Sequence, residues 1–323
     1  MNGRISIAMA TYNGEKYLKE QLDSIFSQST PPYEVCICDD CSEDGTIGII
    51  EQYKKKYNIR YCINSVRQGV NKNFYNAIKL CQGEYIMISD QDDVWAENKI
   101  ELSLKRIKSL EQEFSAEIPL CISFSNDKID SEGNIIHNTA KEKNQYSFRD
   151  MMFSHSEVSN QGCSLIFNRS TANILQTFPS KFSLYPYDLL ICTVALCTGK
   201  KQHYTDKVFY HRIHAQNVSV EQKKGKKSIK SILNRKYYTF SEYFDCSLYK
   251  QRVLKKVYQD YNSIITNKDI RKDTENIIRY YDGYFPSKIK AICQIKDMKP
   301  AKKIKQIFFA ILPLHIFRFM KDK

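Results

Sequence analysis

Short apolar runs alternate with amphipathic stretches over the N-terminal part of the chain. The apolar runs predict four strands, at Ile5–Ala10, Tyr33–Cys38, Ile59–Ile63 and Tyr85–Ile88. Between these runs, apolar residues recur at helical spacing and predict three helices. The residues that mark the helices are Leu18, Leu22, Ile25 and Phe26 in the first, Ile47, Ile50, Tyr53 and Tyr57 in the second, and Phe74, Ala77 and Ile78 in the third, which we expect to span Asn73–Leu80 and to end at Gly83.

This alternation predicts an α/β fold, with a Rossmann-like, mostly parallel sheet flanked by helices and right-handed crossovers. In such sheets, ligands bind beyond the carboxyl ends of the strands. Polar clusters follow three of the predicted strands at that end, at Thr11–Asn13, Asp39–Asp40 and Asp90–Asp93. If these clusters meet at one sheet edge, they form a pocket for a polar, anionic ligand such as a nucleoside diphosphate with a metal ion.

The densest cluster places three carboxylates within four residues, at Asp90, Asp92 and Asp93. Crowded carboxylates repel one another and lose hydration, which is costly unless a cation or a hydrogen-bonding ligand lies among them. Oxygen ligands suit hard cations such as Mg²⁺ or Mn²⁺, which commonly share their shell with substrate phosphates. The alternative is a solvated acidic turn in which Asp92 or Asp93 caps a helix.

The order of four motifs carries a family resemblance. The chain resembles the family 2 glycosyltransferases of GT-A fold, and most closely their bacterial rhamnosyltransferase-like branch, which builds cell-surface polysaccharides. The resemblance covers roughly residues 3 to 220. The motifs are Ala10–Gly14, Asp39–Thr46, Asn73–Ala77 and Asp90–Trp95.

The resemblance implies how the nucleotide is bound. Thr11, Tyr12 and Asn13 match the loop that packs on the base. Asp40 matches the carboxylate that accepts a hydrogen bond from a pyrimidine N3–H, with Asp39 as the fallback. Arg67 is expected near the ribose or the diphosphate.

The acidic cluster matches the D-x-D signature of the family, with Asp90 at the ribose and Asp92 on a Mg²⁺ or Mn²⁺ ion. Asp93 extends the cluster without an assigned role. Trp95 is the only tryptophan, and we expect it to support the loop by packing; direct contact with the sugar is the alternative.

Two further motifs complete the implied active site. Asn160–Arg169 resembles the acceptor side, and Asp188 matches the general base that removes a proton from an acceptor hydroxyl. The alternative for Asp188 is a helix N-cap, because it opens an apolar helical stretch at Ile191–Cys197.

The last motif, His211–Val218, resembles the family's R-x-H-x-x-N stretch, in which Arg212 contacts the diphosphate and His214 binds the metal or a phosphate. A structural histidine is the alternative for His214, and His211 is expected to flank the site. Ala215 and Gln216 depart from the usual glycine and asparagine.

Composition limits the class of protein. A hydrophobic fraction of 42% and 12% aromatic residues are enough to build a core. The 11 cysteines include several in apolar runs, which predicts reduced thiols in a cytoplasmic protein without a signal segment. A zinc site at Cys36, Cys38 and Cys41 lacks a matching second pair.

The net charge of +13 is concentrated at one end. Residues 221–323 contain 25 basic and 10 acidic residues, whereas residues 1–220 contain 24 and 26. We expect a catalytic domain over 1–220 and a basic, mainly helical region over 221–323. The apolar segment Ile304–Phe319 is too interrupted for a transmembrane helix and predicts peripheral binding to an anionic inner membrane surface, with packing on the catalytic domain as the alternative.

The resemblance, together with a single candidate base, implies an inverting, metal-dependent enzyme that moves a sugar from a UDP- or dTDP-sugar to a hydroxyl of a lipid-linked glycan or oligosaccharide. A nucleic-acid-binding protein is disfavoured because the basic charge is confined to the tail. A non-catalytic nucleotide-sugar-binding protein of the same fold and a nucleotidyltransferase are the remaining alternatives.

Overall fold

The computed structural model of the chain describes residues 3–136, 161–178 and 186–214, together with parts of 255–282. The chain divides into two compact units, one of residues 1–145 and 159–223 and one of 146–158 and 224–323. The first unit contains every predicted site residue, and the second contains helix α10 (Lys268–Asp282). The segment Ile304–Phe319 lies outside the described residues, and the domain boundary at residue 220 stays a prediction.

The N-terminal half of the first unit follows the predicted α/β pattern. Four parallel strands pair in the order β3-β2-β1-β4. The strands are β1 (Ile5–Thr11), β2 (Glu34–Asp39), β3 (Ile59–Ile63) and β4 (Tyr85–Ser89), and the connecting helices are α1 (Glu15–Phe26), α2 (Thr46–Lys54) and α3 (Val70–Leu80). All seven predicted elements are therefore present, but α2 ends at Lys54, so Tyr57, which was expected to belong to it, lies beyond its end.

The bounds of α3 correct the sequence prediction. The helix begins at Val70, three residues earlier than expected, and ends at Leu80 with Cys81 as its C-cap, so Gly83 does not end it. Gly83 instead lies against the start of β1, where an added Cβ would be 2.6 Å from the carbonyl oxygen of Arg4. The glycine is needed for this close approach of two backbones.

The second half of the sheet contains antiparallel pairs. Among the described residues the sheet has nine strands, in the order β3-β2-β1-β4-β8-β6-β9-β5, with β7 beside β6. Strand β8 pairs antiparallel with both neighbours, β9 runs parallel to β6, and β5 pairs antiparallel with the end of β9. These strands are β5 (Val94–Trp95), β6 (Leu120–Ile129), β7 (Ile135–Ile136), β8 (Leu165–Asn168) and β9 (Lys200–Arg212).

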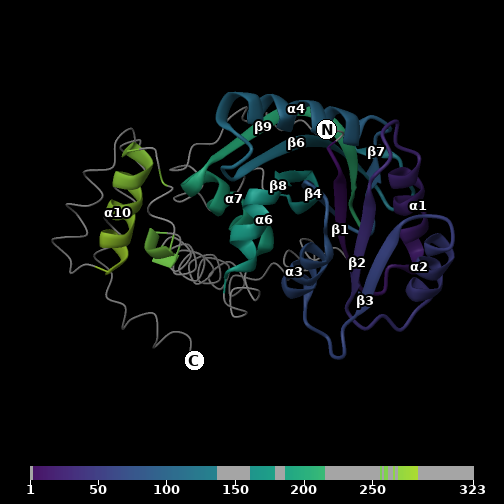
Figure 1. The fold of residues 1–323 in the computed structure, drawn as a ribbon. Helices are drawn as coiled ribbons and strands as arrows, with labels where there is room; N and C mark the ends of the chain where they lie inside the picture. The colour runs from purple at the N-terminus through teal and green to yellow at the C-terminus, as the bar shows by residue number, and fades with distance from the viewer. Residues whose placement is uncertain are drawn as a thin grey trace, which may run out of the picture. The chain divides into compact units, whose positions relative to one another are not determined.

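Helices cover both faces of this sheet, as Figure 1 shows. On one face, α1, α2 and α4 (Lys99–Phe114) share a buried cluster with Ile5, Ile7 and Met9 of β1. On the other, α3 and α6 (Arg169–Gln176) pack beside α7 (Tyr187–Thr198). The carboxyl ends of the parallel strands β1, β2, β3 and β4 lie at the same edge of the sheet.

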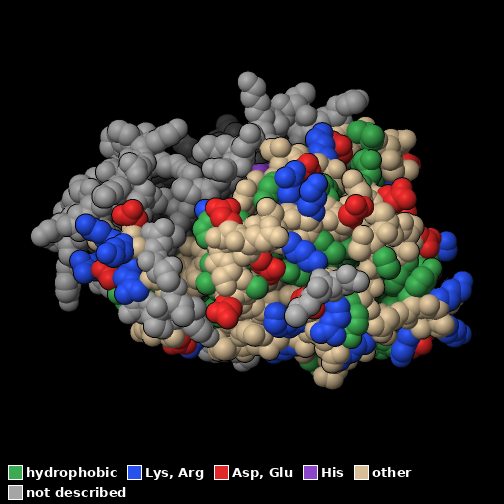
Figure 2. All heavy atoms as spheres, turned by 45° about the horizontal axis from the view of Figure 1, so that its top comes forward, with side chains coloured by type: hydrophobic (Ala, Val, Ile, Leu, Met, Phe, Trp, Pro, Cys, Tyr) green, Lys and Arg blue, Asp and Glu red, His purple; other side chains and the backbone are tan. Residues whose placement is uncertain are grey.

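The surface in Figure 2 carries basic and acidic side chains of the described residues interspersed with one another. Within the part of the chain that the structure describes, no helix has the length and apolar character needed to cross a membrane.

Candidate functional site

The three polar clusters predicted to meet do meet at the carboxyl edge of the parallel strands. Thr11 is the register partner of Asp39, and its hydroxyl donates to Asp39 Oδ2 at 2.7 Å. The Gln91 side chain accepts from the Tyr12 N–H at 2.9 Å and donates to the Tyr12 carbonyl at 3.1 Å. The loop after β4 is thus tied to the loop after β1 by two hydrogen bonds.

The loop after β1 has the close packing that its sequence requires. Asn13 has a positive φ of 46°, which asparagine tolerates better than most residues. Its backbone N–H donates to Ser42 Oγ, and its side-chain oxygen accepts from the Glu43 N–H, both at 2.9 Å. At Gly14, an added Cβ would lie 2.4 Å from Gln91 Oε1, so the glycine leaves the space that Gln91 occupies.

The two carboxylates predicted at the nucleotide base are buried, with Asp39 at 0% and Asp40 at 3% exposure. Asp39 accepts from the backbone and hydroxyl of Ser42, at 2.7 and 2.6 Å. Asp40 accepts from the backbone N–H groups of Gln68 and Gly69, at 2.6 and 2.8 Å. Both carboxylates therefore organise loops in this structure, and their contact with a base stays a prediction.

Arg67, whose backbone precedes Gln68, has its guanidinium 4.0 Å from the centre of the Tyr12 ring. This cation–π contact places a positive charge beside the loop that is predicted to carry the nucleotide. The side chains of Arg67 and Tyr12 are thus in contact, and the placement of Arg67 at the ribose or diphosphate stays a prediction.

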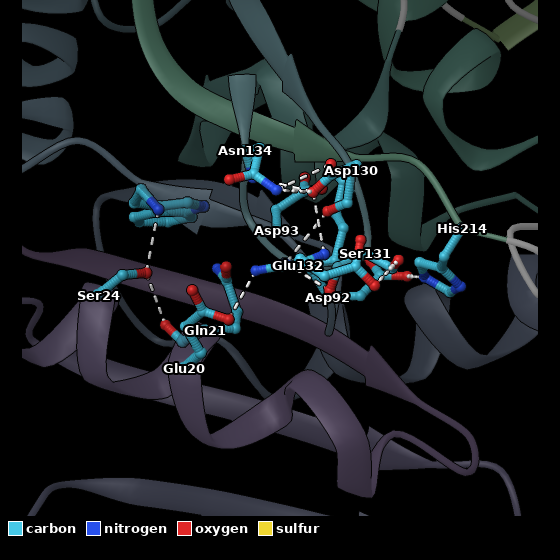
Figure 3. Close-up of polar contacts among 12 residues, drawn as sticks. Glu20, Gln21, Ser24, Asp92, Asp93, Asp130, Ser131, Glu132, Asn134 and His214 are labelled. Carbon is cyan, nitrogen blue, oxygen red and sulfur yellow. Dashed lines mark hydrogen bonds and ion pairs between the residues drawn. The ribbon is translucent and has the colours of Figure 1, made fainter. Parts of the chain in front are cut away.

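The acidic segment after β4 is not a capped helix start. Helix α4 begins at Lys99 and its N-cap is Asn98, so the alternative in which Asp92 or Asp93 caps a helix is wrong. Asp92 Oδ2 lies 2.8 Å from His214 Nε2, and Figure 3 shows the two side chains pointing toward each other. Asp92 and His214 are thus adjacent, and their binding of a metal ion stays a prediction.

Asp93 is fully buried and faces the end of β9. Its Oδ1 accepts from the Arg212 N–H at 3.1 Å and lies 2.9 Å from His211 Nδ1. Its Oδ2 is buried without a hydrogen-bond partner among the described residues. One oxygen of Asp93 therefore anchors β9, and the other is a buried acceptor whose hydrogen-bonding capacity is unused among the described residues.

Burial and the crowding of the carboxylates shift the pKa of Asp90 and of the neighbouring His211. Burial, together with the charges of Asp93 and Asp92, raises the pKa of Asp90 to about 7. Burial opposes protonation of His211, but its hydrogen bond to Asp93 and the nearby carboxylates raise its pKa to about 9. Ligand-type atoms of Asp90, Asp93, Cys163 and His211 lie within 4.8 Å of one another.

Arg212 has a different setting from the one expected for a diphosphate contact. Its side chain is buried, and Nη2 donates to Glu20 at 2.6 Å while Nε donates to the Asp92 carbonyl at 2.9 Å. Nη1 donates to the carbonyls of Asp130 and Ser131, both at 3.3 Å. The guanidinium holds the Asp92 backbone to α1 and to the turn before β7, and its contact with a diphosphate stays a prediction.

The helix N-cap alternative for Asp188 is also wrong, because the N-cap of α7 is Pro186. Asp188 lies in the first turn of α7, where its carboxylate accepts from the Leu189 N–H at 2.7 Å. Burial raises the pKa of Asp188 to about 6, against the lowering effect of that hydrogen bond. A carboxylate with a raised pKa is a stronger base, which suits proton removal near neutral pH.

The acceptor-side motif is described from residue 161 onward and forms the short helix η1 (Gly162–Ser164) and β8. Gly162 lies against Tyr187, since an added Cβ would be 1.8 Å from the Tyr187 hydroxyl. Tyr187 stacks on Phe74 with 4.0 Å between ring centres. The motif therefore lies next to the residue that precedes Asp188, while its role toward an acceptor stays a prediction.

Trp95 is 4% exposed, in line with the packing interpretation. Nine described cysteines are free, as expected for reduced thiols. Cys36 and Cys38 are buried in β2, and the Cys41 thiol donates to the Asn64 carbonyl.

Sequence reasoning missed residues that act on the predicted ones. Gln91 occupies the variable position of D-x-D, and His211 directly precedes Arg212 in β9. The motifs assign roles to the residues beside them and none to Gln91 or His211 themselves. A lysine four residues after the tryptophan, at the start of an amphipathic helix, was the one signal for Lys99. Glu20 carried no signal at all on its exposed stretch of α1.

Comparisons with known proteins agree with this geometry. The family model described as glycosyl transferase family 2 matches residues 6–173. The chain is 29% identical to chondroitin synthase of Escherichia coli over 67% of its own length and 30% of that protein's. It is 33% identical to the dTDP-rhamnosyl transferase RfbG of Shigella flexneri, over 50% of its own length and 54% of RfbG.

The fold is similar to that of S. aureus TarS residues 1–349 in complex with UDP-GlcNAc, with a TM-score of 0.55 at 16% identity over 95% of this chain and 79% of that one. This chain spans about a third to a half of the two curated relatives. Since the family model covers more than half of the sequence and the strand-end clusters meet as its motifs require, the chain belongs to glycosyl transferase family 2.

Proposed function

We propose that this protein is an inverting, metal-dependent glycosyltransferase of cell-surface polysaccharide biosynthesis. It moves a sugar from a UDP- or dTDP-sugar to a hydroxyl group of a lipid-linked glycan or oligosaccharide. The observation that carries the proposal is the meeting of the Asp90–Asp93 segment with the end of β9 at the sheet edge, on the same unit as the Asp188 carboxylate.

The residues present fit a divalent cation. The acidic segment has a buried oxygen without a hydrogen-bond partner, on Asp93, and a carboxyl group of raised pKa, on Asp90. Asp92 offers a carboxylate oxygen and His214 an imidazole nitrogen. Mn²⁺ accepts both kinds of ligand, and Mg²⁺ does so with water molecules completing its coordination shell. Asp92 and His214 would hold the ion, and the bound ion would stabilise negative charge on the departing diphosphate.

The nucleotide is bound by the loops after β1 and β2. Thr11, Tyr12 and Asn13 pack on the base, and Arg67 faces the ribose or diphosphate from its place over the Tyr12 ring. Asp90 accepts from the ribose hydroxyls. A nucleoside diphosphate brings the positive charge of its metal ion to the carboxylates, which offsets their mutual repulsion.

Asp188 is the general base of the transfer. Its carboxylate takes the proton of the acceptor hydroxyl as that oxygen forms a bond to the anomeric carbon. The bond from the anomeric carbon to the diphosphate oxygen breaks on the opposite face, and the electron pair leaves with the nucleoside diphosphate. One displacement of this kind inverts the configuration at the anomeric carbon.

The basic region after residue 220 supports a location on the inner face of the cell membrane. A cationic, partly apolar segment binds anionic lipid without spanning the bilayer. A lipid-linked acceptor would then be presented at the same surface as the catalytic domain.

Turnover of a panel of UDP- and dTDP-sugars, followed by release of the nucleoside diphosphate, tests the proposal. We expect one sugar donor to be turned over in Mn²⁺ or Mg²⁺, and Asp188→Asn to lower the rate by about 10²- to 10⁴-fold while UDP or dTDP still binds. Near-normal turnover by Asp188→Asn would remove Asp188 as the base. Absence of turnover of every donor by the wild-type protein would contradict the proposed activity.

A further inference from the structure

Lys99 is a buried cation in the interior of the first unit. It is 1% exposed, although lysine is almost never buried without a partner. Its ammonium lies 3.8 Å from the centre of the Trp95 ring and 4.3 Å from that of Phe209. The Lys99 ammonium therefore lies against two aromatic rings and is shielded from solvent.

On the donor side, Lys99 contacts the strand pair that follows the acidic segment. Trp95 and Phe209 are register partners in the β5–β9 pair, and β5 begins at the residue after Asp93. Burial lowers the pKa of Lys99 to about 7, and the charges of Asp93 and Asp90 oppose this shift because they favour the ammonium form. Lys99 thus packs on the strand pair that begins directly after Asp93, within electrostatic range of Asp93 and Asp90.

On the acceptor side, the same ammonium donates a hydrogen bond of 2.8 Å to the Cys163 carbonyl. Cys163 is the middle residue of η1, and its neighbour Gly162 lies in contact with the Tyr187 hydroxyl. Tyr187 is in turn fixed by its stack on Phe74 and is bonded directly to Asp188. A path of contacts therefore runs from Trp95, two residues after Asp93, through Lys99 and η1 to Tyr187, the residue beside Asp188.

An apolar side chain of the same length would fill this space without burying a charge, so packing alone does not explain a lysine here. What the ammonium adds is one group that attracts the acidic segment and donates to the η1 backbone at the same time. Catalysis by displacement depends on such spacing, because a misplacement of about 1 Å between base and donor can lower the rate about 10²-fold.

We propose that Lys99 is a positioning residue of the transfer reaction, which holds the η1 turn and Tyr187 at a fixed distance from the Asp90–Asp93 segment, so that Asp188 faces the bound donor. The inference rests on the proposed glycosyltransferase activity. In this role, Lys99 aligns the base with the donor and does not contribute to nucleotide binding.

The test compares Lys99→Met with Lys99→Arg and with Lys105→Met, a matched control at an exposed position of the same helix. UDP or dTDP binding with Mn²⁺ is measured calorimetrically, and kcat and KM are measured with the donor that the wild-type protein turns over. The fluorescence of Trp95, the only tryptophan, reports on the site itself. Thermal unfolding of each variant reports on folding.

For Lys99→Met we expect a kcat about 10²-fold lower, with nucleotide Kd and donor KM within about threefold of wild type and a changed Trp95 emission. Lys99→Arg, which keeps a charged donor, should recover part of the rate, and Lys105→Met should behave as wild type. If Lys99→Met does not fold, Lys99→Gln replaces it, because the amide keeps an N–H donor for Cys163 without the charge, and the same fall in kcat is expected.

A folded Lys99→Met or Lys99→Gln variant with wild-type kcat would overturn the inference, as would equal losses of kcat and nucleotide affinity. Gly162→Ala gives an independent check, since it displaces Tyr187 without touching Lys99 and should lower kcat in the same manner. Failure of the wild-type protein to turn over any donor contradicts the proposed activity and is thereby distinguished from failure of this inference.

Discussion

At the scale of single residues, Asp92 and Asp93 each contact a histidine at or just after the end of β9, namely His214 and His211. The carboxylates Asp90, Asp92 and Asp93 stood out by type and spacing, and the contact of Asp92 with His214 followed the motif. Burial cannot be read from spacing, so the different settings of Asp93 and Arg212 emerged only from tertiary contacts. For Asp188, the sequence allowed two roles, general base or helix N-cap. The structure excludes the N-cap, because α7 begins at Tyr187.

The raised pKa of Asp188 predicts how the rate depends on pH. The base works only when deprotonated, and burial raises its pKa from 3.8 to about 6. With donor and metal saturating, kcat should therefore reach a plateau above pH 7 and fall about tenfold per pH unit below pH 6. The measurement is kcat from pH 5 to pH 8, and a flat profile over that range would argue against Asp188 as the base.

At the scale of elements, apolar runs and helical spacing were enough to predict β1 to β4 and α1 to α3. Each of these elements has a regular hydrophobic pattern within its own short segment of sequence. The placement of β8 between β4 and β6 was not predicted, because strand partners are chosen by packing across long sequence separations. The reach of Gln91 across to the Tyr12 backbone is a consequence of the parallel β1–β4 pairing, which puts both loops at one edge.

Gly14→Ala tests whether that loop contact supports nucleotide binding. The added Cβ would displace the Gln91 side chain, which can rotate away. The rotation would break its two hydrogen bonds to the Tyr12 backbone, each of which contributes roughly 1 kcal/mol. We expect the Kd for UDP or dTDP with Mn²⁺ to rise about tenfold, measured by calorimetry, with the fold retained.

The matched control for this change is Gly48→Ala in α2, where an added Cβ meets nothing within 4 Å. It should leave nucleotide binding unchanged and stabilise the protein by about 0.5–1 kcal/mol in chemical unfolding, because alanine is the better helix former. Equal nucleotide affinity in both variants would show that the Tyr12–Gln91 contact is dispensable.

At the scale of the whole molecule, the basic charge is concentrated in a region that the family model does not match. The family model ends at residue 173, whereas the excess of basic residues begins after residue 220. From charge counts alone, the sequence predicts a boundary at residue 220, and that boundary stays a prediction. The sequence did not predict that residues 146–158 group with the second unit, because charge counts do not mark that segment.

Deletion of residues 304–323 tests the membrane assignment. The deletion removes an apolar segment flanked by lysines, so the truncated protein should partition less into vesicles that contain anionic lipid, by about tenfold in a sedimentation assay. Donor turnover by the catalytic domain should persist. Unchanged partitioning on the same vesicles would refute a role of this segment at the membrane.

Calorimetric titration of the purified protein with UDP and with dTDP, each in Mn²⁺, in Mg²⁺ and in EDTA, measures the metal-dependent nucleotide binding on which the proposed activity depends. We expect one of the two nucleotides to bind in the presence of a divalent cation, and this binding to be lost both in EDTA and in Asp92→Ala. Binding that is unaffected by EDTA and by Asp92→Ala, or no binding of either nucleotide under any condition, would contradict a metal-dependent donor site at the Asp90–Asp93 segment.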